Sequence, residues 1–398
     1  NLNAVLRTIC RDGDISWLNS YIVILLEGQR RYITMRLNIL HVDTEKSWRG
    51  GERQAYFLIK YLPADSFTSF VATPKDKPFY THLADLTCTR IPFSMFGEWD
   101  IVAAWRLSRI IKHNSIDIVH AHTSHALGIG ALSRLFTCFK LIGSRRVDYP
   151  LAKHFLSRLK YKTADRIVAI SYAVKNILID HGIDPDRISV VHSGVELLDT
   201  PTVDTKVMKK TLGIPLDHTV IGNIGALTDQ KDHDTFIAAA DKILQIKPNT
   251  IFLIIGGGAR QKELEKHIHA LQRENQIRLL GFRDDLQDLI GIMDLYVVSS
   301  CFEGMGTSTL DVMYQAKPVV ATNVGGIPEI VEDGKTGYLV DVRNYQGIAD
   351  RVIELLNMSV YYALLTFCQQ EKSKQFTAQN MARGISQVYR NICKGDGL

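Results

Sequence analysis

The chain has 398 residues, of which 46% are hydrophobic and 22% are charged, and its formal net charge is +5. This length exceeds what one hydrophobic core usually serves, so we expect two domains with a ligand site between them. The charge is too small and too dispersed to indicate a nucleic-acid partner, and the longest apolar run near the start, residues 21–26, is too short to span a membrane.

The cysteines and the first residues bear on the compartment in which the protein works. The six cysteines are far apart and form no C-x-x-C pair, which argues against zinc ribbons and disulfide frameworks and favours a reducing cytoplasm. Asp12 and Asp14 precede the first apolar run, whereas a secretory signal carries only positive charge there. We therefore interpret residues 1–34 as an extension of uncertain structure, upstream of a fold that begins at Met35.

From residue 36 onward, short apolar runs alternate with amphipathic stretches. The runs are LNILHV, IVHAH, KLIGS, RIVAIS and ISVVHSG in the first half, and TVIGNIGAL, TIFLIIGGG, IRLLGF, LYVVSS, PVVAT and GYLV in the second. Strands that are apolar throughout and alternate with helices are typical of a parallel sheet covered on both faces. The sequence predicts an α/β protein with two doubly wound, Rossmann-like domains.

The alternation is interrupted once, and the interruption sets the domain limits. Residues 199–217 lose the pattern, so we place an N-terminal domain at 35–198 and a C-terminal domain at 199–375. The last stretch, 376–398, contains an amphipathic helix that we expect to pack back on the N-terminal domain. Because ligands bind at the carboxyl ends of parallel strands, the cleft between the domains is the expected site of chemistry.

The stretch at residues 299–331, SSCFEGMGTSTLDVMYQAKPVVATNVGGIPEIV, places Glu303 and Asp311 eight residues apart where a strand gives way to a helix. A helix that begins here leaves its first backbone N–H groups unpaired, which makes an anion site suited to phosphate. The residues that form it are Gly304, Gly306, Thr307 and Ser308. Carboxylates on both sides of a phosphate suit a nucleotide sugar, although an N-capped helix with two solvated acids explains the spacing alone equally well.

The segment EGMGTSTLDVMYQAKPVVATNVGGIPE resembles, almost residue by residue, the donor-binding signature of the retaining glycosyltransferases of family 4, which have the GT-B fold. The resemblance covers nearly the whole chain after residue 36. It implies that Glu303 contacts the transferred sugar and that Asp311 binds the ribose hydroxyls, with an arm one methylene shorter than the family's Glu. The diphosphate would be held by the backbone amides of Gly306, Thr307 and Ser308.

The segment at residues 221–240, IGNIGALTDQKDHDTFIAAA, is similar to the family's GRLxxxKG turn, whose Arg and Lys neutralise the leaving diphosphate. Lys231 matches the Lys, but Ala226 stands where the Arg is expected. We expect another cation to substitute, either Arg260, Arg283 or a cation of the N-terminal domain. The loop around Arg283 also corresponds to the one that cups the nucleotide base through its backbone atoms, so it belongs to the expected donor site.

Turns of the N-terminal domain extend the resemblance. Gly50 and Gly51 of RGGERQ follow the first strand and open a helix, which makes an anion-friendly turn that in the family approaches the donor phosphates and the acceptor. Arg49 and Arg53 beside them are candidates for binding an anionic acceptor. Arg145, in the family-like turn GSRRVDYP, is a third candidate.

The stretch DIVHAHTSHALGIGALS ends a strand with two histidines and matches the family's DxxHxH. The match favours His122 as the residue next to the donor sugar and His120 as a structural residue, since a lone histidine is more often a hydrogen-bonded core residue than a catalyst. The expected catalytic set is therefore Glu303, Lys231 and His122.

No metal or other cofactor is expected. The D-x-D triplets at residues 184–186 and 232–234 lie in a turn and at a helix start, and nothing in the sequence places them beside a phosphate. Helix amides and Lys231 would take the place of a metal cation.

A basic amphipathic stretch at residues 151–166, LAKHFLSRLKYKTADR, belongs to the N-terminal domain. Such a helix can rest on anionic lipid. It can equally be a core helix with a solvated basic face, and the sequence leaves both interpretations open.

These features predict a retaining glycosyltransferase of the hexosyl type that moves a sugar from a nucleotide-diphosphate sugar to a glycan or glycolipid hydroxyl. The basic helix and the pair Arg49 and Arg53 suggest bacterial lipopolysaccharide or other surface-glycan synthesis, in the cytoplasm or peripherally at the inner face of the membrane. Two alternatives stay open. One is a nucleotide-sugar-binding partner subunit that has lost activity, motivated by Ala226 and Asp311, and the other is a nucleotide-sugar 2-epimerase, for which no suitably placed acids are evident.

Overall fold

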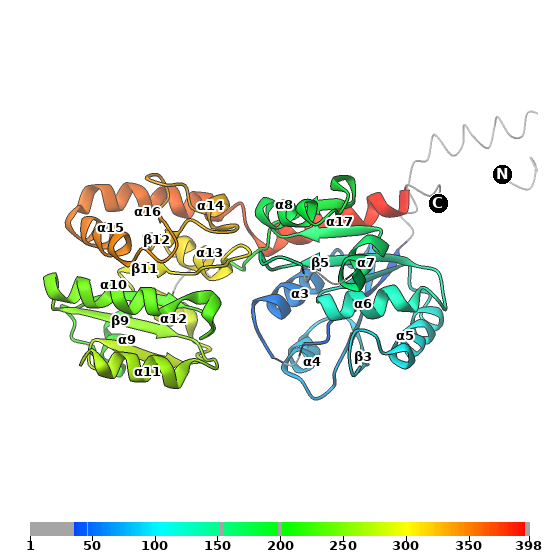
Figure 1. Ribbon diagram of the computed structural model, residues 1–398, viewed down its shortest axis with the longest axis horizontal. Helices are drawn as coiled ribbons and strands as arrows, with labels where there is room; N and C mark the ends of the chain where they lie inside the picture. The colour runs from blue at the N-terminus through cyan, green and yellow to red at the C-terminus, as the bar shows by residue number, and fades with distance from the viewer. Residues whose placement is uncertain (1–35, 46, 152–154, 198–200, 395–398) are drawn as a thin grey trace, which may run out of the picture. The chain divides into compact units, whose positions relative to one another are not determined.

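The structure is a computed structural model that describes residues 36–45, 47–151, 155–197 and 201–394, and it contains two parallel β-sheets packed with helices (Figure 1). The predicted fold class, two doubly wound parallel sheets, is confirmed. The segment interpreted above as an N-terminal extension, residues 1–34, lies outside the described residues, and so does the domain boundary placed at residues 198 and 199.

The first sheet has seven parallel strands in the order β3-β2-β1-β4-β5-β6-β7. These strands are β1 (Leu37–Val42), β2 (Phe67–Thr73), β3 (Thr89–Pro92), β4 (Ile118–Ala121), β5 (Lys140–Arg145), β6 (Arg166–Ala169) and β7 (Ile188–Val190). Its helices are α3 (Gly50–Tyr61), α4 (Pro78–His82), α5 (Ile101–His113), α6 (Ser124–Ser133), α7 (Phe155–Thr163) and α8 (Tyr172–Asp180), with the short 3-10 helices η1 (Leu83–Asp85) and η2 (Pro185–Arg187).

The second sheet has six parallel strands in the order β10-β9-β8-β11-β12-β13. These strands are β8 (Thr219–Ile224), β9 (Thr250–Ile255), β10 (Ile277–Gly281), β11 (Leu295–Val298), β12 (Val319–Thr322) and β13 (Tyr338–Val340). The helices that follow the first sheet are α9 (Thr205–Thr211), η3 (Asp229–Lys231), α10 (His233–Ile246), α11 (Gln261–Ala270), α12 (Leu286–Gly291), α13 (Thr307–Tyr314), α14 (Ile327–Ile330), α15 (Tyr345–Asn357), α16 (Ser359–Ser373) and α17 (Ala378–Lys394).

The strand order of each sheet fixes where a ligand can bind. The chain builds each sheet outward from a central strand in one direction and then crosses to build it in the other, so β1 pairs with β4 and β8 pairs with β11 at the crossing points. Ligands of doubly wound sheets bind at the carboxyl ends of the strands that flank such a crossing. The sequence segments that leave β1, β4, β8 and β11 are therefore the ones to inspect.

The last helix, α17, packs against the N-terminal domain. Its buried face joins a hydrophobic cluster with residues of β1, α3 and β2, and this cluster includes Ile39, Phe57, Phe67, Ala382, Ile385, Val388 and Tyr389. The Tyr389 hydroxyl lies 2.6 Å from Nδ1 of His120. Tyr389, near the end of the chain, therefore lies beside His120 at the carboxyl end of β4.

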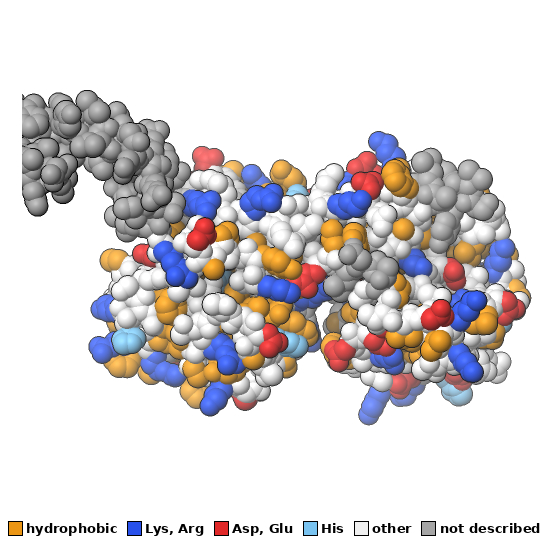
Figure 2. All heavy atoms as spheres, turned by 180° about the vertical axis from the view of Figure 1, so that it is seen from behind, with side chains coloured by type: hydrophobic (Ala, Val, Ile, Leu, Met, Phe, Trp, Pro, Cys, Tyr) orange, Lys and Arg blue, Asp and Glu red, His pale blue; other side chains and the backbone are white. Residues whose placement is uncertain are grey.

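The basic stretch at 151–166 differs from its expected form. Helix α7 includes only Phe155–Thr163, and residues 152–154 lie outside the described residues. Lys160 is buried and forms an ion pair with Glu98, so it does not belong to a solvated basic face, whereas Arg158 and Lys162 are exposed. The face of the molecule seen in Figure 2 carries acidic and basic side chains interspersed. Within the described ranges, no helix combines the length and the apolar character that crossing a bilayer requires.

Candidate active site

The turn that contains Glu303 lies at the carboxyl end of β11. Helix α13 begins at Thr307, with Gly306 as its N-cap. Thr307 and Ser308 are the first two residues of this helix, so their N–H groups have no partner within it and suit an anion. The N–H of Gly306 differs from the prediction because it donates to Oε1 of Glu303 at 3.2 Å. Of the three backbone N–H groups predicted to bind phosphate, those of Thr307 and Ser308 begin the helix, and that of Gly306 is bonded to the Glu303 carboxylate.

Both the side chain and the backbone of Glu303 are bonded to neighbouring residues. Its carboxylate forms an ion pair with the Lys231 ammonium, and Ser300 Oγ lies 3.3 Å from the same carboxylate oxygen. The two charged side chains are only 11% and 19% exposed. The backbone N–H of Glu303 donates to Oδ2 of Asp148, at 2.7 Å. The structure therefore brings together two residues of the predicted catalytic set that lie far apart in the sequence.

Lys231 reaches Glu303 because β8 and β11 are neighbours. Lys231 ends η3, which follows β8, and the Cys301 N–H donates to the carbonyl oxygen of Gln230 at 2.8 Å. The Ser299 hydroxyl donates to the carbonyl oxygen of Lys231 at 2.9 Å. These bonds join η3 to the segment after β11 and fix the ammonium beside the acid.

Glycine is required at position 304 for packing. A Cβ added to Gly304 would lie 2.4 Å from the carbonyl oxygen of Arg146 and 3.0 Å from Cδ1 of Ile170. Such a contact is too short for any side chain, so the backbone of the Glu303 turn approaches the loop after β5 closely. We predicted a close approach of Gly304 to phosphate, and in this structure it approaches protein backbone.

Asp311, one turn into α13, is bonded to an arginine of α3. Nη1 and Nη2 of Arg53 donate to its two carboxylate oxygens at 2.9 and 3.2 Å, a bidentate pair. The start of α3 also lies near the start of α13, since a Cβ built on Gly50 would be 3.7 Å from Oγ1 of Thr307. Two helix N-termini and one guanidinium therefore meet at the predicted ribose and phosphate site.

The cations named as replacements for the missing arginine at Ala226 are differently placed. Arg260 forms ion pairs with Asp234 at 2.7 Å and with Asp229 at 3.2 Å, and Arg283 pairs with Asp285 at 2.8 Å. Both guanidiniums pair with nearby acids, as Lys231 and Arg53 also do. Arg53, which we assigned to the acceptor from sequence, is the N-terminal-domain arginine that the structure brings to α13.

The turn with Gly50 and Gly51 opens α3 as predicted by the sequence pattern, and Arg49 is its exposed N-cap. The N–H of Arg49 donates to the Glu52 carboxylate at 2.7 Å. Glu52 is buried, and its burial, together with the charge of nearby Asp43, raises the pKa of its carboxyl to about 7. Burial likewise raises the pKa of Asp43 to about 6. An acidic pair that sequence reasoning missed thus lies behind the glycine turn.

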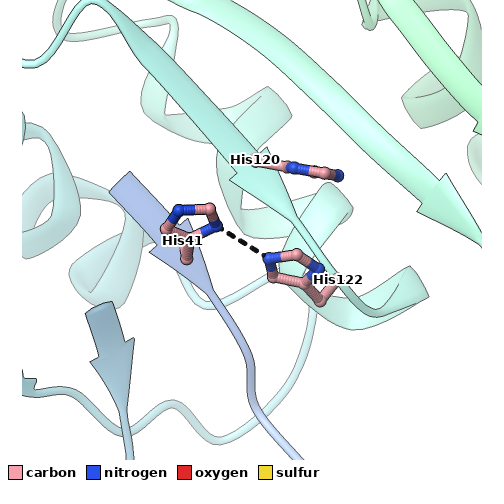
Figure 3. A group of neighbouring side chains, drawn as sticks. All are labelled: His41, His120 and His122. Atoms are coloured by element: carbon pink, nitrogen blue, oxygen red, sulfur yellow. Dashed lines mark hydrogen bonds between the residues drawn. The ribbon is translucent and has the colours of Figure 1, made fainter. Parts of the chain in front are cut away.

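Three buried histidines lie at the carboxyl ends of β1 and β4 (Figure 3). Nδ1 of His41 is 3.0 Å from Nε2 of His122, and Nδ1 of His122 is 2.9 Å from Nη2 of Arg146. His120 has both ring nitrogens bonded, one to the Tyr389 hydroxyl at 2.6 Å and the other to Ser144 Oγ at 2.8 Å. Burial lowers the pKa of all three, to about 3 for His41, so each ring is neutral at ordinary pH.

The hydrogen bonds fix the tautomer of His122. A guanidinium can only donate, so Nδ1 of His122 accepts from Arg146 and the ring proton of His122 lies on Nε2. Nε2 then donates to Nδ1 of His41, which leaves the His41 proton on Nε2, a buried atom without a hydrogen-bond partner. Both nitrogens of His122 are thus committed inside the protein. This residue can act through its position, but not by carrying a proton.

Three imidazoles this close are a possible metal site, but their surroundings do not suit a cation. Both nitrogens of His120 are already bonded to hydroxyl groups, and a nitrogen of His122 faces the guanidinium of Arg146. A metal ion would have to displace these bonds beside a fixed positive charge. The chemistry of the donor set therefore favours a hydrogen-bonded network.

Arg145, the third arginine predicted to bind an acceptor, points away from this network. It is buried, donates to the Tyr161 hydroxyl at 3.1 Å and also bonds the carbonyl oxygen of Tyr149. In this structure the Arg145 guanidinium therefore bonds protein groups, and its role in acceptor binding stays a prediction. Consecutive side chains at a strand end face opposite sides of the sheet, so its neighbour Arg146 is the one that contacts His122.

Two protein families match this chain. Residues 48–197 match the family described as Glycosyltransferase Family 4, and residues 204–376 match the family described as Glycosyl transferases group 1. The UDP-Gal:alpha-D-GlcNAc-diphosphoundecaprenol alpha-1,3-galactosyltransferase of Escherichia coli is 22% identical over 378 residues, which cover 89% of this chain and 97% of that protein.

Solved structures share the fold. Anabaena Alr3699/HepE in complex with UDP and glucose superposes with a TM-score of 0.79 at 23% identity, covering 89% of this chain and 100% of that one. The apo form of the lipopolysaccharide outer core galactosyltransferase WaaB superposes with a TM-score of 0.69 at 16% identity, covering 89% of this chain and 99% of that one. The two family matches and the shared architecture identify this chain as a family 4 glycosyltransferase of the GT-B fold, an enzyme that transfers a sugar from a nucleotide sugar.

Proposed function

We propose that this glycosyltransferase transfers a hexose from a uridine-diphosphate sugar, with retention at the anomeric carbon and without a metal ion, to a hydroxyl of a lipid-linked bacterial glycan. The observation that carries the proposal is the Lys231–Glu303 ion pair beside the first amides of α13. In the proposal, Lys231 is the cation that faces the leaving diphosphate, and Glu303 is the carboxylate that contacts a sugar hydroxyl.

The charges around α13 support binding of a diphosphate. Lys231 and Arg53 each face an acid, Glu303 and Asp311 respectively. A diphosphate carries more negative charge than either carboxylate, so it competes for both cations, while the acids become acceptors for sugar and ribose hydroxyls. Arg53 would then supply the second positive charge that Ala226 does not, and Asp311 beside it would accept ribose hydroxyls.

The same groups support the proposal of retention without a metal ion. In the proposed step the bond from the anomeric carbon to the phosphate oxygen breaks, the acceptor oxygen bonds to that carbon from the same face, and its proton passes to the leaving phosphate. His122 cannot receive this proton because both of its nitrogens are bonded to protein. Lys231, Arg53 and the helix amides would stabilise the diphosphate charge that a metal ion stabilises in other transferases.

The relatives guide the choice of donor and acceptor. The Escherichia coli relative is named for transfer of galactose from UDP-Gal to a GlcNAc attached to diphosphoundecaprenol, and the Anabaena structure contains UDP and glucose. A uridine donor and a polyprenyl-diphosphate glycan at the inner face of the membrane, used in lipopolysaccharide or other surface-glycan synthesis, are therefore the first substrates to test.

The test measures nucleotide release and product configuration. Purified protein is incubated with UDP-, GDP-, ADP- and CMP-sugars in the presence of a chelator, with and without a lipid-linked glycan acceptor. We expect UDP release that depends on the acceptor, an α-linked product from an α-linked donor by NMR, and a loss of at least about a hundredfold in Glu303→Gln. Donor binding without turnover would instead support the alternative of an inactive partner subunit.

A further inference from the structure

Helix α5 and the segment before it expose five large apolar side chains. Phe96 is fully exposed, and Trp99, Ile101, Val102 and Trp105 are 43%, 56%, 63% and 51% exposed. We call these five residues the α5 surface. Single exposed apolar residues are ordinary, but a group of this size that includes two tryptophans marks an interaction site.

Folding does not require the α5 surface. The side of α5 that packs into the domain is complete without it and consists of Ala103, Ala104, Leu107, Ser108 and Ile111. The helix lies beside α6 (Figure 1), with which it makes its main helix contact. Its exposed apolar side chains are therefore an addition to an already amphipathic helix.

The same helix continues the surface with positive charge. Val102, Trp105, Arg109 and Lys112 are spaced by three and four residues, so they form one exposed stripe along α5. The Arg109 guanidinium lies 6.0 Å from the Trp105 ring centroid. Arg106, next to Trp105, is also exposed.

The two acids next to this stripe in the sequence, Glu98 and Asp100, are already engaged. Glu98 pairs with the buried Lys160, and Asp100 accepts the backbone N–H groups of Ala103 and Phe96 at the start of α5. The stripe therefore presents tryptophan and cations together, with its neighbouring carboxylates directed to the protein. A second copy of this chain would set the cations of one stripe against those of the other, so charge disfavours self-association through this face.

Tryptophan at a water–hydrocarbon boundary, with arginine and lysine beside it, is the side-chain chemistry that suits an anionic bilayer surface. We propose that the α5 surface and the cations Arg106, Arg109 and Lys112 dock the enzyme on a membrane that contains anionic lipid. This inference rests on the proposed lipid-linked acceptor. It assigns the docking role to α5, whereas the sequence pointed to the stretch that contains α7.

The experiment measures partition of the full chain onto vesicles by flotation. The vesicles contain phosphatidylcholine alone or phosphatidylcholine with phosphatidylglycerol, at low and at raised salt. Wild-type protein should float with the anionic vesicles, lose much of this binding at raised salt, and bind neutral vesicles weakly.

Two double variants test the two components of the surface. Arg109→Glu with Lys112→Glu should weaken partition at least about thirtyfold, because each basic residue near an anionic surface contributes about fivefold. Trp99→Ser with Trp105→Ser should weaken it at least about tenfold, and the blue shift of tryptophan emission on vesicle binding should decrease.

Matched control variants distinguish a specific effect of the α5 surface from a general effect of changing charge or removing an apolar side chain. Lys262→Glu with Lys266→Glu changes two exposed lysines about one helical turn apart on α11, and Ile246→Ser removes an exposed apolar residue at the end of α10. These variants should partition like the wild type. If control and surface variants lost vesicle binding equally, the assignment would be overturned. It would also be overturned if both surface variants bound vesicles as strongly as the wild type.

Two further measurements distinguish other occupants and the function itself. A dimer in solution that the tryptophan variant converts to monomer would show that a second copy covers the surface, and would overturn the membrane proposal. Turnover with a short water-soluble acceptor should be unchanged in the surface variants, while turnover with a vesicle-bound acceptor should fall with partition. Vesicle binding without any sugar transfer would refute the proposed function and leave the docking surface intact.

Discussion

Replacing Lys231 by Ala tests the charge arrangement of the donor site most directly. At a separation of about 4 Å and an effective dielectric of about 20, one unit charge stabilises another by roughly 4 kcal/mol. Lys231 is partly exposed, at 19%, so solvent screens part of this interaction. We take about 2–3 kcal/mol as the loss of transition-state stabilisation, which corresponds to a decrease in kcat of about a hundredfold.

The same substitution leaves the Glu303 carboxylate, which is only 11% exposed, without its ion-pair partner. Removing one partner of a fully buried pair costs about 3–5 kcal/mol, and the partial exposure of both side chains reduces this cost, so we expect the variant to fold with a lower free energy of unfolding. Turnover would be followed by UDP release at saturating donor and acceptor, and folding by thermal unfolding. Lys335→Ala is the matched control, because Lys335 is 76% exposed and lies 3.8 Å from Glu332.

A Lys231→Ala enzyme with near-normal kcat would refute the reasoning, since it would show that the leaving diphosphate does not depend on this cation. Lys231→Arg separates charge from shape. It keeps the positive charge but replaces a compact ammonium by a planar guanidinium, so partial recovery of kcat is expected. A Lys231→Ala protein that fails to unfold cooperatively would show that the ion pair is structural and would equally contradict the assignment.

Two further predictions concern buried histidines. His41→Leu removes the acceptor for Nε2–H of His122 and should lower kcat about tenfold, whereas His41→Asn keeps an acceptor and should retain most activity. Imidazole ¹⁵N chemical shifts should show that His122 is protonated on Nε2 in the wild type. A proton on Nδ1 would contradict the assigned tautomer. His233 is buried, and neither of its ring nitrogens has a hydrogen-bond partner. Burial lowers its pKa from 6.5 to about 4. Below pH 6.5 the unfolded state therefore takes up a proton that the folded state does not. The free energy of unfolding should therefore fall between pH 6.5 and 4, by up to about 3 kcal/mol from this residue, and His233→Leu should lose less stability over that range in urea titrations; equal pH dependence in both proteins would exclude the mechanism.

The sequence predicted the parallel sheets and the position of the donor turn because both depend on local patterns. Apolar runs of the length of a strand, separated by amphipathic stretches, identify the strands of a covered parallel sheet without knowledge of their order. The glycines and acids at residues 303–311 lie in one continuous segment, so their spacing is visible in the sequence. The partners of these acids were not visible, since Lys231 and Arg53 come from other segments and meet them only through the strand order.

The histidine network shows a second limit of sequence reasoning. His122 was found through a motif, whereas His41 and Asp43 were missed although they stand at the carboxyl end of the first strand, LNILHV, and just beyond it. The order of strands places β1 beside β4, and only this order makes the end of β1 part of the same site. Polar residues at the end of a central strand of a doubly wound sheet are the signal that would have found them.

The choice between Arg145 and Arg146 could not be made from the motif, because it depends on which face of the sheet each side chain takes. Arg145 ends β5 and bonds Tyr161 of α7, whereas Arg146 follows the strand and donates to His122. If the register of β5 shifted by one residue, Arg145 and Arg146 would exchange faces of the sheet. The cation that bonds His122 would then lie away from the histidines, and the tautomer of His122 would no longer be fixed. The position of a single charge relative to the strand end therefore determines whether the histidine is a fixed group or a proton carrier, and this position is a property of the sheet rather than of the motif.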